Sequence, residues 1–159
     1  FQQQHLIEPQ FYKTTVTEDH LDEMGHLNIQ WYIAFYDKAA WQFFAEMGMT
    51  QTYFAEHQSG SFALQQYAYY YNEVRLGETI TIHTRLLGRS PKRAHFIHFM
   101  LNQTRSGLAA TLETLSSHAD LKARRTSPFP PDIAKIIDKT LSNHRQLNWD
   151  APTCGIMRA

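Results

Sequence analysis

Apolar and polar residues recur along this chain with two different periods, which divides it into elements. Residues 29–47 carry aromatic and aliphatic side chains at helical spacing, between Asn28 as a candidate cap and Gly48 as a candidate stop. Residues 11–17 are rich in aromatic and β-branched residues, which is typical of a strand. The pattern therefore predicts a strand followed by a long helix, and residues 50–57 add a short helical turn.

After this helix the spacing changes to that of strands. Turn segments that contain Gly, Ser or Pro separate four predicted strands, at residues 61–74, 79–87, 92–103 and 108–121. Hairpin-length connections imply antiparallel pairing. The helix is apolar over much of its circumference, so we expect other structure to wrap it. The predicted fold is α+β, with an antiparallel sheet wrapped around one long central helix.

A Pro-rich stretch at residues 128–131 ends the predicted sheet region. Residues 132–147 then indicate a modest helix with Asp132 as its cap. We assign residues 1–127 to one domain and residues 128–159 to a C-terminal helical extension packed on the same domain.

Composition limits the classes of partner and compartment. The 15 basic and 15 acidic residues cancel, so we expect neither nucleic acid nor a membrane as a partner. The single cysteine, Cys154, excludes an intramolecular disulfide framework, and residues 1–5 lack the features of a secretory signal. No apolar run approaches the ~20 residues of a spanning helix. We expect a cytoplasmic protein.

Nine histidines raise the question of a metal site. His95 and His98 stand three apart on a predicted strand, so their side chains point to opposite faces and cannot share an ion. Zinc-type H-E-x-x-H and Cys-pair motifs are absent, as is the G-x-S-x-G of serine hydrolases. We expect no metal.

The acidic segment at residues 17–28 lies directly before the predicted helix. It places the carboxylate of Asp22 near a helix N-terminus, where free N–H groups and the helix dipole stabilise an oxyanion. Asp22 is therefore a candidate nucleophile or general base for acyl transfer. The same residues also fit an ordinary acidic loop that favours the helix dipole, and spacing alone leaves both readings open.

Residues 22–28 read Asp-Glu-Met-Gly-His-Leu-Asn. Together with residues 31–35 they resemble the D-x-x-G-H-V-N-x-x-x-Y-x-x-F signature of hotdog-fold acyl-CoA thioesterases of the 4-hydroxybenzoyl-CoA thioesterase-like group. Residues 71–78 resemble the family's Y-x-x-x-V-x-x-G-D segment, and residues 88–93 its basic turn. The resemblance extends over about residues 11–121, and it implies that the predicted 1–127 domain is a hotdog thioesterase domain.

Two residues depart from the family signature. His20 stands where many relatives carry a second Asp, and Ile29 replaces a second Asn. Both departures leave the mechanism possible and leave the identity of the acyl group open.

This resemblance implies a thioester hydrolase with coenzyme A as part of the substrate and no separate cofactor. Asp22 then occupies the position of the nucleophile or general base, and the backbone N–H of Ile29 the position that polarises the carbonyl. Asn28 is expected to cap the helix. His26 is expected to order the loop or touch the acyl end, although an ordinary hydrogen-bonded turn histidine fits as well. Asp37 is a second candidate carboxylate.

The basic turn carries Arg89, Lys92 and Arg93, in a region that the family uses for the phosphates of coenzyme A. A solvated hairpin tip is the alternative reading. The family also pairs sheets edge to edge, which implies a homodimer or homotetramer. Two other functions stay open, namely a non-catalytic acyl-CoA binding module and an acyl-thioester hydratase or dehydratase.

Overall fold

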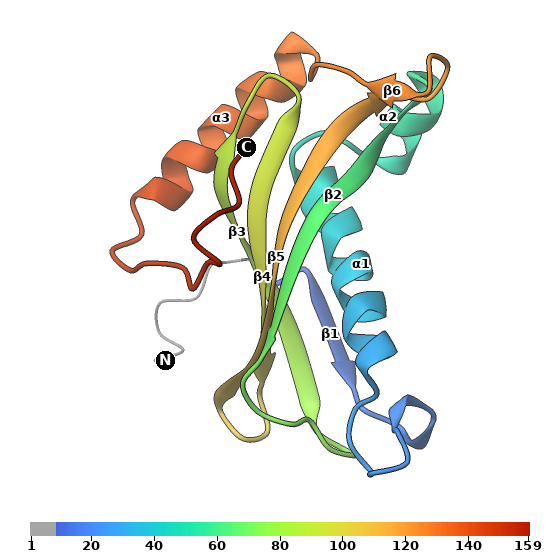
Figure 1. The fold of residues 1–159 in the computed structure, drawn as a ribbon, viewed down its shortest axis with the longest axis vertical. Helices are drawn as coiled ribbons and strands as arrows, with labels where there is room; N and C mark the ends of the chain where they lie inside the picture. The colour runs from blue at the N-terminus through green and yellow to red at the C-terminus, as the bar shows by residue number, and fades with distance from the viewer. Residues whose placement is uncertain (1–8) are drawn as a thin grey trace. The chain divides into compact units, whose positions relative to one another are not determined.

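The computed structural model describes residues 9–159, and its elements follow the predicted order (Figure 1). The first are β1 (Tyr12–Thr15), the short 3-10 helix η2 (Glu18–His20), α1 (Ile29–Glu46) and α2 (Gln51–Glu56). Four long strands follow, β2 (Ser59–Tyr70), β3 (Thr79–Arg89), β4 (Arg93–Asn102) and β5 (Gly107–Asp120). The last are the two-residue strand β6 (Arg125–Thr126), which was not predicted, and α3 (Pro131–Arg145). Residues 1–5, where the sequence shows no secretory signal, lie outside the described residues.

The strands form one sheet in the order β1-β3-β4-β5-β2, with β6 paired to β5. β1 runs antiparallel to β3, and Tyr12 lies opposite Ile82. The short turns between β3, β4 and β5 make these strands antiparallel as well. The N–H of Leu121 donates to Gln58 and that of Tyr71 donates to Ala109, so β2 is antiparallel to β5. This confirms the predicted α+β hotdog fold, and it leaves β2 at an edge.

The chain divides into two compact units, and each is described by itself. Unit 1 contains the residues up to Gln42 together with Ala68–Thr84 and His98–Leu112, and unit 2 contains Phe43–Tyr67, Arg85–Ile97 and Glu113–Ala159. Helix α1 and strands β2 to β5 contribute residues to both units. The proposed boundary after residue 127 stays a prediction, because the last 32 residues share unit 2 with parts of the sheet.

Helix α1 packs against sheet residues within each unit. In unit 1 its buried side chains Tyr32, Phe35, Tyr36 and Ala39 form one cluster with Ile80, Ile82, Met100 and Leu112 of the strands. In unit 2, Phe43 and Phe44 pack against Phe96 of β4, with ring centroids 5.4 Å and 5.8 Å apart. Each fully buried large apolar side chain contributes about 1.5–3 kcal/mol relative to its exposed state, so this packing anchors the helix on which the site is built.

The opposite side of α1 is open in the single chain. Ile33 is 42% exposed and Trp41 is 41% exposed, and Asp37 also faces solvent. The sheet therefore covers one side of the helix, as the packing of its buried residues shows, and Ile33, Asp37 and Trp41 lie on the side that it leaves uncovered. Within residues 9–159, no helix has both the length and the apolar character needed to cross a bilayer.

Helix α1 ends at the predicted glycine, whereas α3 begins differently from the prediction. Gly48 ends α1 with φ +86°, and a Cβ at this position would lie 2.9 Å from the side chain of Ile133. For α3, the prediction that Asp132 is the cap is wrong. The helix begins at Pro131, which suits a first helical position, and Asp132 lies in the first turn, where its charge favours the dipole.

Helix α3 lies beside the end of β3 within unit 2 (Figure 1). The backbone N–H of Leu86 donates to Nδ1 of His144 at 2.8 Å, and the guanidinium of Arg89 donates to both carboxylate oxygens of Asp138 at 2.6 Å and 2.8 Å. The C-terminal helix is therefore tied to the sheet by directional polar contacts.

A buried histidine in unit 1 makes stability depend on pH. His98 stacks on Tyr36, its Nδ1 lies 2.6 Å from Oγ1 of Thr84, and burial lowers its pKa from 6.5 to about 3. Between these two values the unfolded chain binds a proton that the folded chain does not, so the free energy of unfolding falls as pH decreases below about 6.5. The slope from this group is at most about 1.4 kcal/mol per pH unit.

We expect chemical denaturation of the His98→Gln variant to show a flatter dependence on pH between 6.5 and 4 than the wild type. His118 and His144, whose pKa values burial also lowers, are retained in both proteins and serve as an internal reference. Equal slopes for the two proteins would contradict the assignment to His98.

Candidate active site

The acidic loop before α1 is closed by backbone pairing. Leu21 pairs with Leu27, the N–H of Asp22 donates to the carbonyl of His26 at 2.8 Å, and the N–H of Asn28 donates to His20 at 2.8 Å. Gly25 has φ +80° at the tip, a conformation that glycine adopts without strain. Asp22 therefore lies in a small hairpin that leads directly into α1.

The side chain of His20 also anchors this hairpin to α1. Its ring packs edge-on against Trp31, with centroids 4.6 Å apart, and against Phe35, with centroids 5.2 Å apart. His20 therefore holds the hairpin against two aromatic side chains of the helix.

The carboxylate of Asp22 is half-buried and held in one orientation. Its Oδ1 accepts the backbone N–H of Met24 at 2.9 Å and that of His26 at 3.1 Å. Oδ2 has no hydrogen-bond partner within the part of the chain that the structure describes. Oδ1 of Asp22 therefore stabilises the loop, and Oδ2 remains available to act as a base or nucleophile.

The start of α1 supplies a free donor. Asn28 caps the helix as expected, since its Oδ1 accepts the N–H of Gln30 at 3.1 Å and its carbonyl accepts the N–H of Trp31 at 2.9 Å. The N–H of Ile29, the first helical residue, has no acceptor among residues 9–159. This N–H carries the positive end of the helix dipole and is free to bind an oxyanion.

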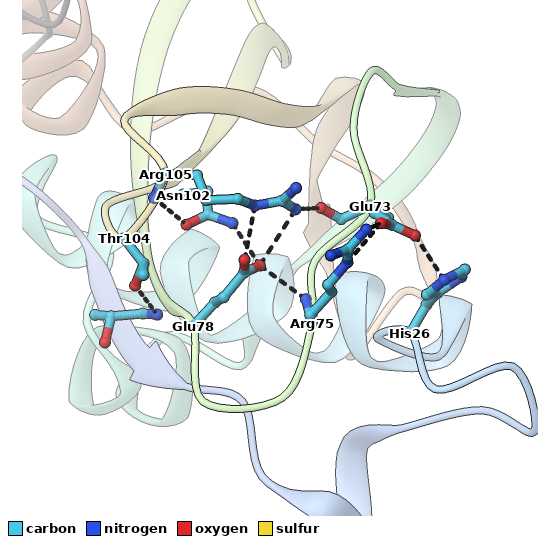
Figure 2. Close-up of polar contacts among 8 residues, drawn as sticks. His26, Glu73, Arg75, Glu78, Asn102, Thr104 and Arg105 are labelled. Carbon is cyan, nitrogen blue, oxygen red and sulfur yellow. Dashed lines mark hydrogen bonds and ion pairs between the residues drawn. The ribbon is translucent and has the colours of Figure 1, made fainter.

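A polar network ties the hairpin to the neighbouring loops of unit 1 (Figure 2). His26 Nε2 lies 2.6 Å from a carboxylate oxygen of Glu73, which also pairs with Arg75. Glu78 is buried and accepts from the N–H of Arg75 at 2.8 Å and from the guanidinium of Arg105 at 2.6 Å. In the structure, His26 thus orders the loop through Glu73.

This network was not predicted as such. Only the acidic position of the Y-x-x-x-V-x-x-G-D segment, which Glu78 fills, gave a signal for it. Glu78 also accepts from the side-chain amide of Asn102 at 2.7 Å, so one buried carboxylate joins the turn before β3 to the hairpin after β4. Because its partners are far apart in sequence, spacing could not reveal them.

Aromatic side chains of α1 and β2 meet within unit 1. The rings of Tyr32 on α1 and Tyr70 on β2 meet edge to face with centroids 5.0 Å apart. Burial, followed by the neighbouring Tyr70 and the charge of Asp22, raises the pKa of Tyr32 to about 12. Tyr32 is therefore a neutral phenol close enough to Asp22 to be affected by its charge.

The three predicted phosphate-binding residues differ in whether they form ion pairs. Arg89 is held by Asp138 of α3, so its guanidinium is already paired. Lys92 is half-buried and Arg93 is exposed, and neither forms an ion pair within the described residues. Lys92 and Arg93 are thus the free cations of this turn.

No group of three His, Cys, Asp or Glu side chains within residues 9–159 is arranged to hold a metal ion.

Comparisons with known proteins identify the family. The model of the thioesterase-like superfamily matches residues 16–137. The chain is similar to a betainyl-CoA thioesterase of Pseudomonas aeruginosa, with 28% identity over 86% of each chain. It is also 30% identical, over 74% of its length, to an L-carnitine dehydrogenase/betainyl-CoA thioesterase of Agrobacterium fabrum, of which it spans about a quarter (24%).

The fold is shared with a Staphylococcus aureus protein solved in complex with CoA. That structure has a TM-score of 0.84 and 21% identity, with 97% of each chain covered. The chain belongs to the thioesterase-like superfamily and is, at the level of this family, a thioester hydrolase with the hotdog fold.

Proposed function

We propose that this protein hydrolyses acyl-CoA thioesters to the free acid and coenzyme A, with Asp22 and the N–H of Ile29 acting on the thioester carbonyl. The observation that carries the proposal is the free N–H at the start of α1, directly after a hairpin that leaves Oδ2 of Asp22 unbonded. A carboxylate and an oxyanion donor on one short segment are the minimum that acyl transfer needs. Coenzyme A enters as part of the substrate, and no other cofactor takes part.

Two routes use the same residues. Oδ2 of Asp22 attacks the carbonyl carbon, the C–S bond breaks with CoA leaving as its thiol or thiolate, and water then cleaves the acyl anhydride. Alternatively, Oδ2 takes a proton from water as the oxygen of that water attacks the same carbon, and the C–S bond then breaks as CoA leaves and takes up the proton from Asp22. In both routes the carbonyl oxygen gains negative charge, and the N–H of Ile29 donates to it. After hydrolysis in ¹⁸O-labelled water under single-turnover conditions, ¹⁸O in the carboxylate of Asp22 identifies the anhydride route, because the general-base route forms no bond to that carboxylate.

Lys92 and Arg93 are proposed to bind the phosphates of coenzyme A. Ammonium and guanidinium groups suit phosphate oxygens, and these two have no competing carboxylate within the described residues. Hydrogen bonds to charged groups contribute about 1.5–3 kcal/mol each. We expect the Lys92→Ala/Arg93→Ala variant to raise KM for an acyl-CoA roughly tenfold or more, with kcat little changed.

The same acyl group on pantetheine, which lacks the nucleotide, is the matched control for this variant. Wild type and variant are expected to hydrolyse the pantetheine thioester equally well. A KM for acyl-CoA that stays at the wild-type value would assign this turn to a solvated hairpin tip.

We propose a homodimer, or a homotetramer built from dimers, in which β2 pairs with β2 of a second copy. β2 lies at the edge of the sheet, and it exposes Leu64, Tyr67, Tyr69 and Tyr70 by 42% to 47%. A long exposed edge strand with aromatic side chains favours pairing with another strand. Sedimentation of the purified protein checks this proposal, and a monomer at micromolar concentration would contradict it.

The test of the proposed function is release of free CoA from a panel of acyl-CoA thioesters of graded length, aromaticity and charge. Betainyl-CoA belongs in this panel because two relatives are named for it. We expect multiple turnovers with at least one thioester. Tight binding without CoA release across the panel would instead identify a binding module, and a hydrated or dehydrated acyl-CoA product would identify a hydratase or dehydratase.

A further inference from the structure

One residue of the hairpin, His26, makes two backbone contacts to Asp22. The N–H of His26 donates to Oδ1 of Asp22 at 3.1 Å, and its carbonyl accepts the N–H of Asp22 at 2.8 Å. The other donor to Oδ1 is the N–H of Met24, whose side chain is 76% exposed at the tip of the hairpin. The position of the His26 backbone therefore determines the direction in which the unbonded Oδ2 of Asp22 points.

The imidazole of His26 is held from outside the hairpin, by Glu73 in the loop between β2 and β3 (Figure 2). Nε2 of His26 lies 2.6 Å from Oε2 of Glu73. An ionised carboxylate can only accept, so Nε2 is the donor. Backbone contacts accompany this bond, since the N–H of Leu27 donates to the carbonyl of Val74 at 2.8 Å and His26 pairs with Arg75. Glu73 thus connects the hairpin that carries Asp22 to the neighbouring loop.

Glu73 is itself fixed within this loop. Its Oε1 accepts from Nε of Arg75 at 2.6 Å, and its carbonyl accepts from the guanidinium of Arg105. The hydrogen bond from Arg75, with the charges of Arg75, His26 and Arg105, lowers the pKa of Glu73. The buried Glu78 accepts the N–H of Arg75 at 2.8 Å and so fixes the same turn. The carboxylate of Glu73 is therefore ionised at neutral pH and held toward His26.

The pair of His26 and Glu73 is too exposed to contribute much to stability. The side chain of His26 is 41% exposed and that of Glu73 is 30% exposed. Pairs that are this accessible to water add little to the free energy of unfolding. The contact nevertheless ends on the residue whose backbone holds the candidate nucleophile, which points to a role in the site.

We propose that Glu73 is a positioning residue for the reaction, which holds the imidazole of His26 and thereby keeps Oδ2 of Asp22 directed at the thioester carbonyl. The inference rests on the proposed thioesterase function and adds a residue to it. A displacement of about 1 Å in a reacting group can cost about 100-fold in rate. Loss of this contact is therefore expected to affect the chemical step more than substrate binding.

A double-mutant cycle tests whether Glu73 acts through His26. We expect Glu73→Ala to lower kcat for the best acyl-CoA roughly 10- to 100-fold, with KM little changed. His26→Ala retains the backbone contacts to Asp22 but loses the imidazole, and a similar loss is expected. The double variant is expected to lose no more than either single variant, because the two side chains form one contact.

Two further variants separate positioning from a general effect of charge or fold. Glu73→Gln retains an oxygen that accepts from Nε2 of His26, so it is expected to keep most of the wild-type kcat. Glu18→Ala removes an exposed acid from the segment before the hairpin and is expected to leave kcat unchanged. The thermal unfolding midpoints of all these variants are expected to lie close to that of the wild type.

Hydrogen exchange measures the placement of Asp22 independently of turnover. The N–H groups of Met24 and His26 both donate to Oδ1 of Asp22, and we expect them to exchange faster in Glu73→Ala than in the wild type or in Glu73→Gln. Exchange at the wild-type rate in Glu73→Ala would overturn the inference.

Failure of the inference and failure of the proposed function give different results. If the wild type hydrolyses acyl-CoA, a wild-type kcat in Glu73→Ala, or losses that multiply in the double variant, would overturn the positioning role and leave the thioesterase function intact. If the wild type hydrolyses no thioester, the proposed function fails, and the exchange rates alone show whether Glu73 places Asp22.

Discussion

Replacing Asp22 with Asn is expected to lower kcat for acyl-CoA hydrolysis by roughly 10²–10⁴-fold, the range for general acid–base catalysis. Asn keeps an oxygen at the Oδ1 position, so it still accepts the N–H groups of Met24 and His26 that shape the loop. The substitution replaces the unbonded Oδ2 with an amide nitrogen that is neither base nor nucleophile. Steady-state kinetics on the best acyl-CoA measures the loss, and circular dichroism with thermal unfolding checks that the loop and fold remain.

A neighbouring acid provides the matched control for this prediction. Glu23 lies next to Asp22 and is exposed. Glu23→Gln removes one negative charge from the same loop and is expected to keep wild-type turnover. Wild-type turnover in Asp22→Asn would mean that Asp22 only shapes the loop, and a matching loss in Glu23→Gln would mean that the charge of the loop matters more than the position of Asp22.

Replacing Ile29 with Pro is expected to lower kcat by roughly 10²–10³-fold, the cost of removing one oxyanion donor. Proline lacks a backbone N–H, and Ile29 is the first residue of α1, where proline is well tolerated. Because the N–H of Ile29 has no acceptor within residues 9–159, its removal breaks no hydrogen bond of the described fold. We therefore expect a catalytic loss with little change in thermal stability.

Ile29→Ala separates the N–H from the side chain. The side chain of Ile29 is 65% exposed, and the alanine variant retains the N–H. It is expected to have a kcat close to wild type. If Ile29→Ala loses as much activity as Ile29→Pro, the side chain of Ile29 and not its N–H is the group that the reaction needs.

Local sequence signals predicted the long helix and the four long strands well. The stretch from Asn28 to Gly48 combines a cap, helical periodicity and a glycine stop, and each of these acts within a few residues. The strands were predicted within a few residues of their observed bounds because β-branched and aromatic runs alternate with turn residues. The order and the antiparallel pairing of the strands then followed from the short connections between them.

Contacts between distant residues were the part that the sequence did not reveal. The pairing of Arg89 with Asp138 joins residues 49 positions apart, so the basic turn appeared to offer three free cations. The meeting of Tyr32 with Tyr70 and the partners of Glu78 depend likewise on how strands and helix pack. Asp132 was misassigned as a cap because the stronger preference of Pro131 for a first helical position decided the boundary.

The central claim is that one carboxylate and one helix N–H act on the same thioester carbonyl. Single-turnover release of CoA, with enzyme in excess, measures that step for wild type, Asp22→Asn and Ile29→Pro after equal substrate binding has been verified. We expect both variants to bind acyl-CoA as the wild type does and to release CoA at least about 100-fold more slowly. A wild-type rate of CoA release in either variant would contradict it.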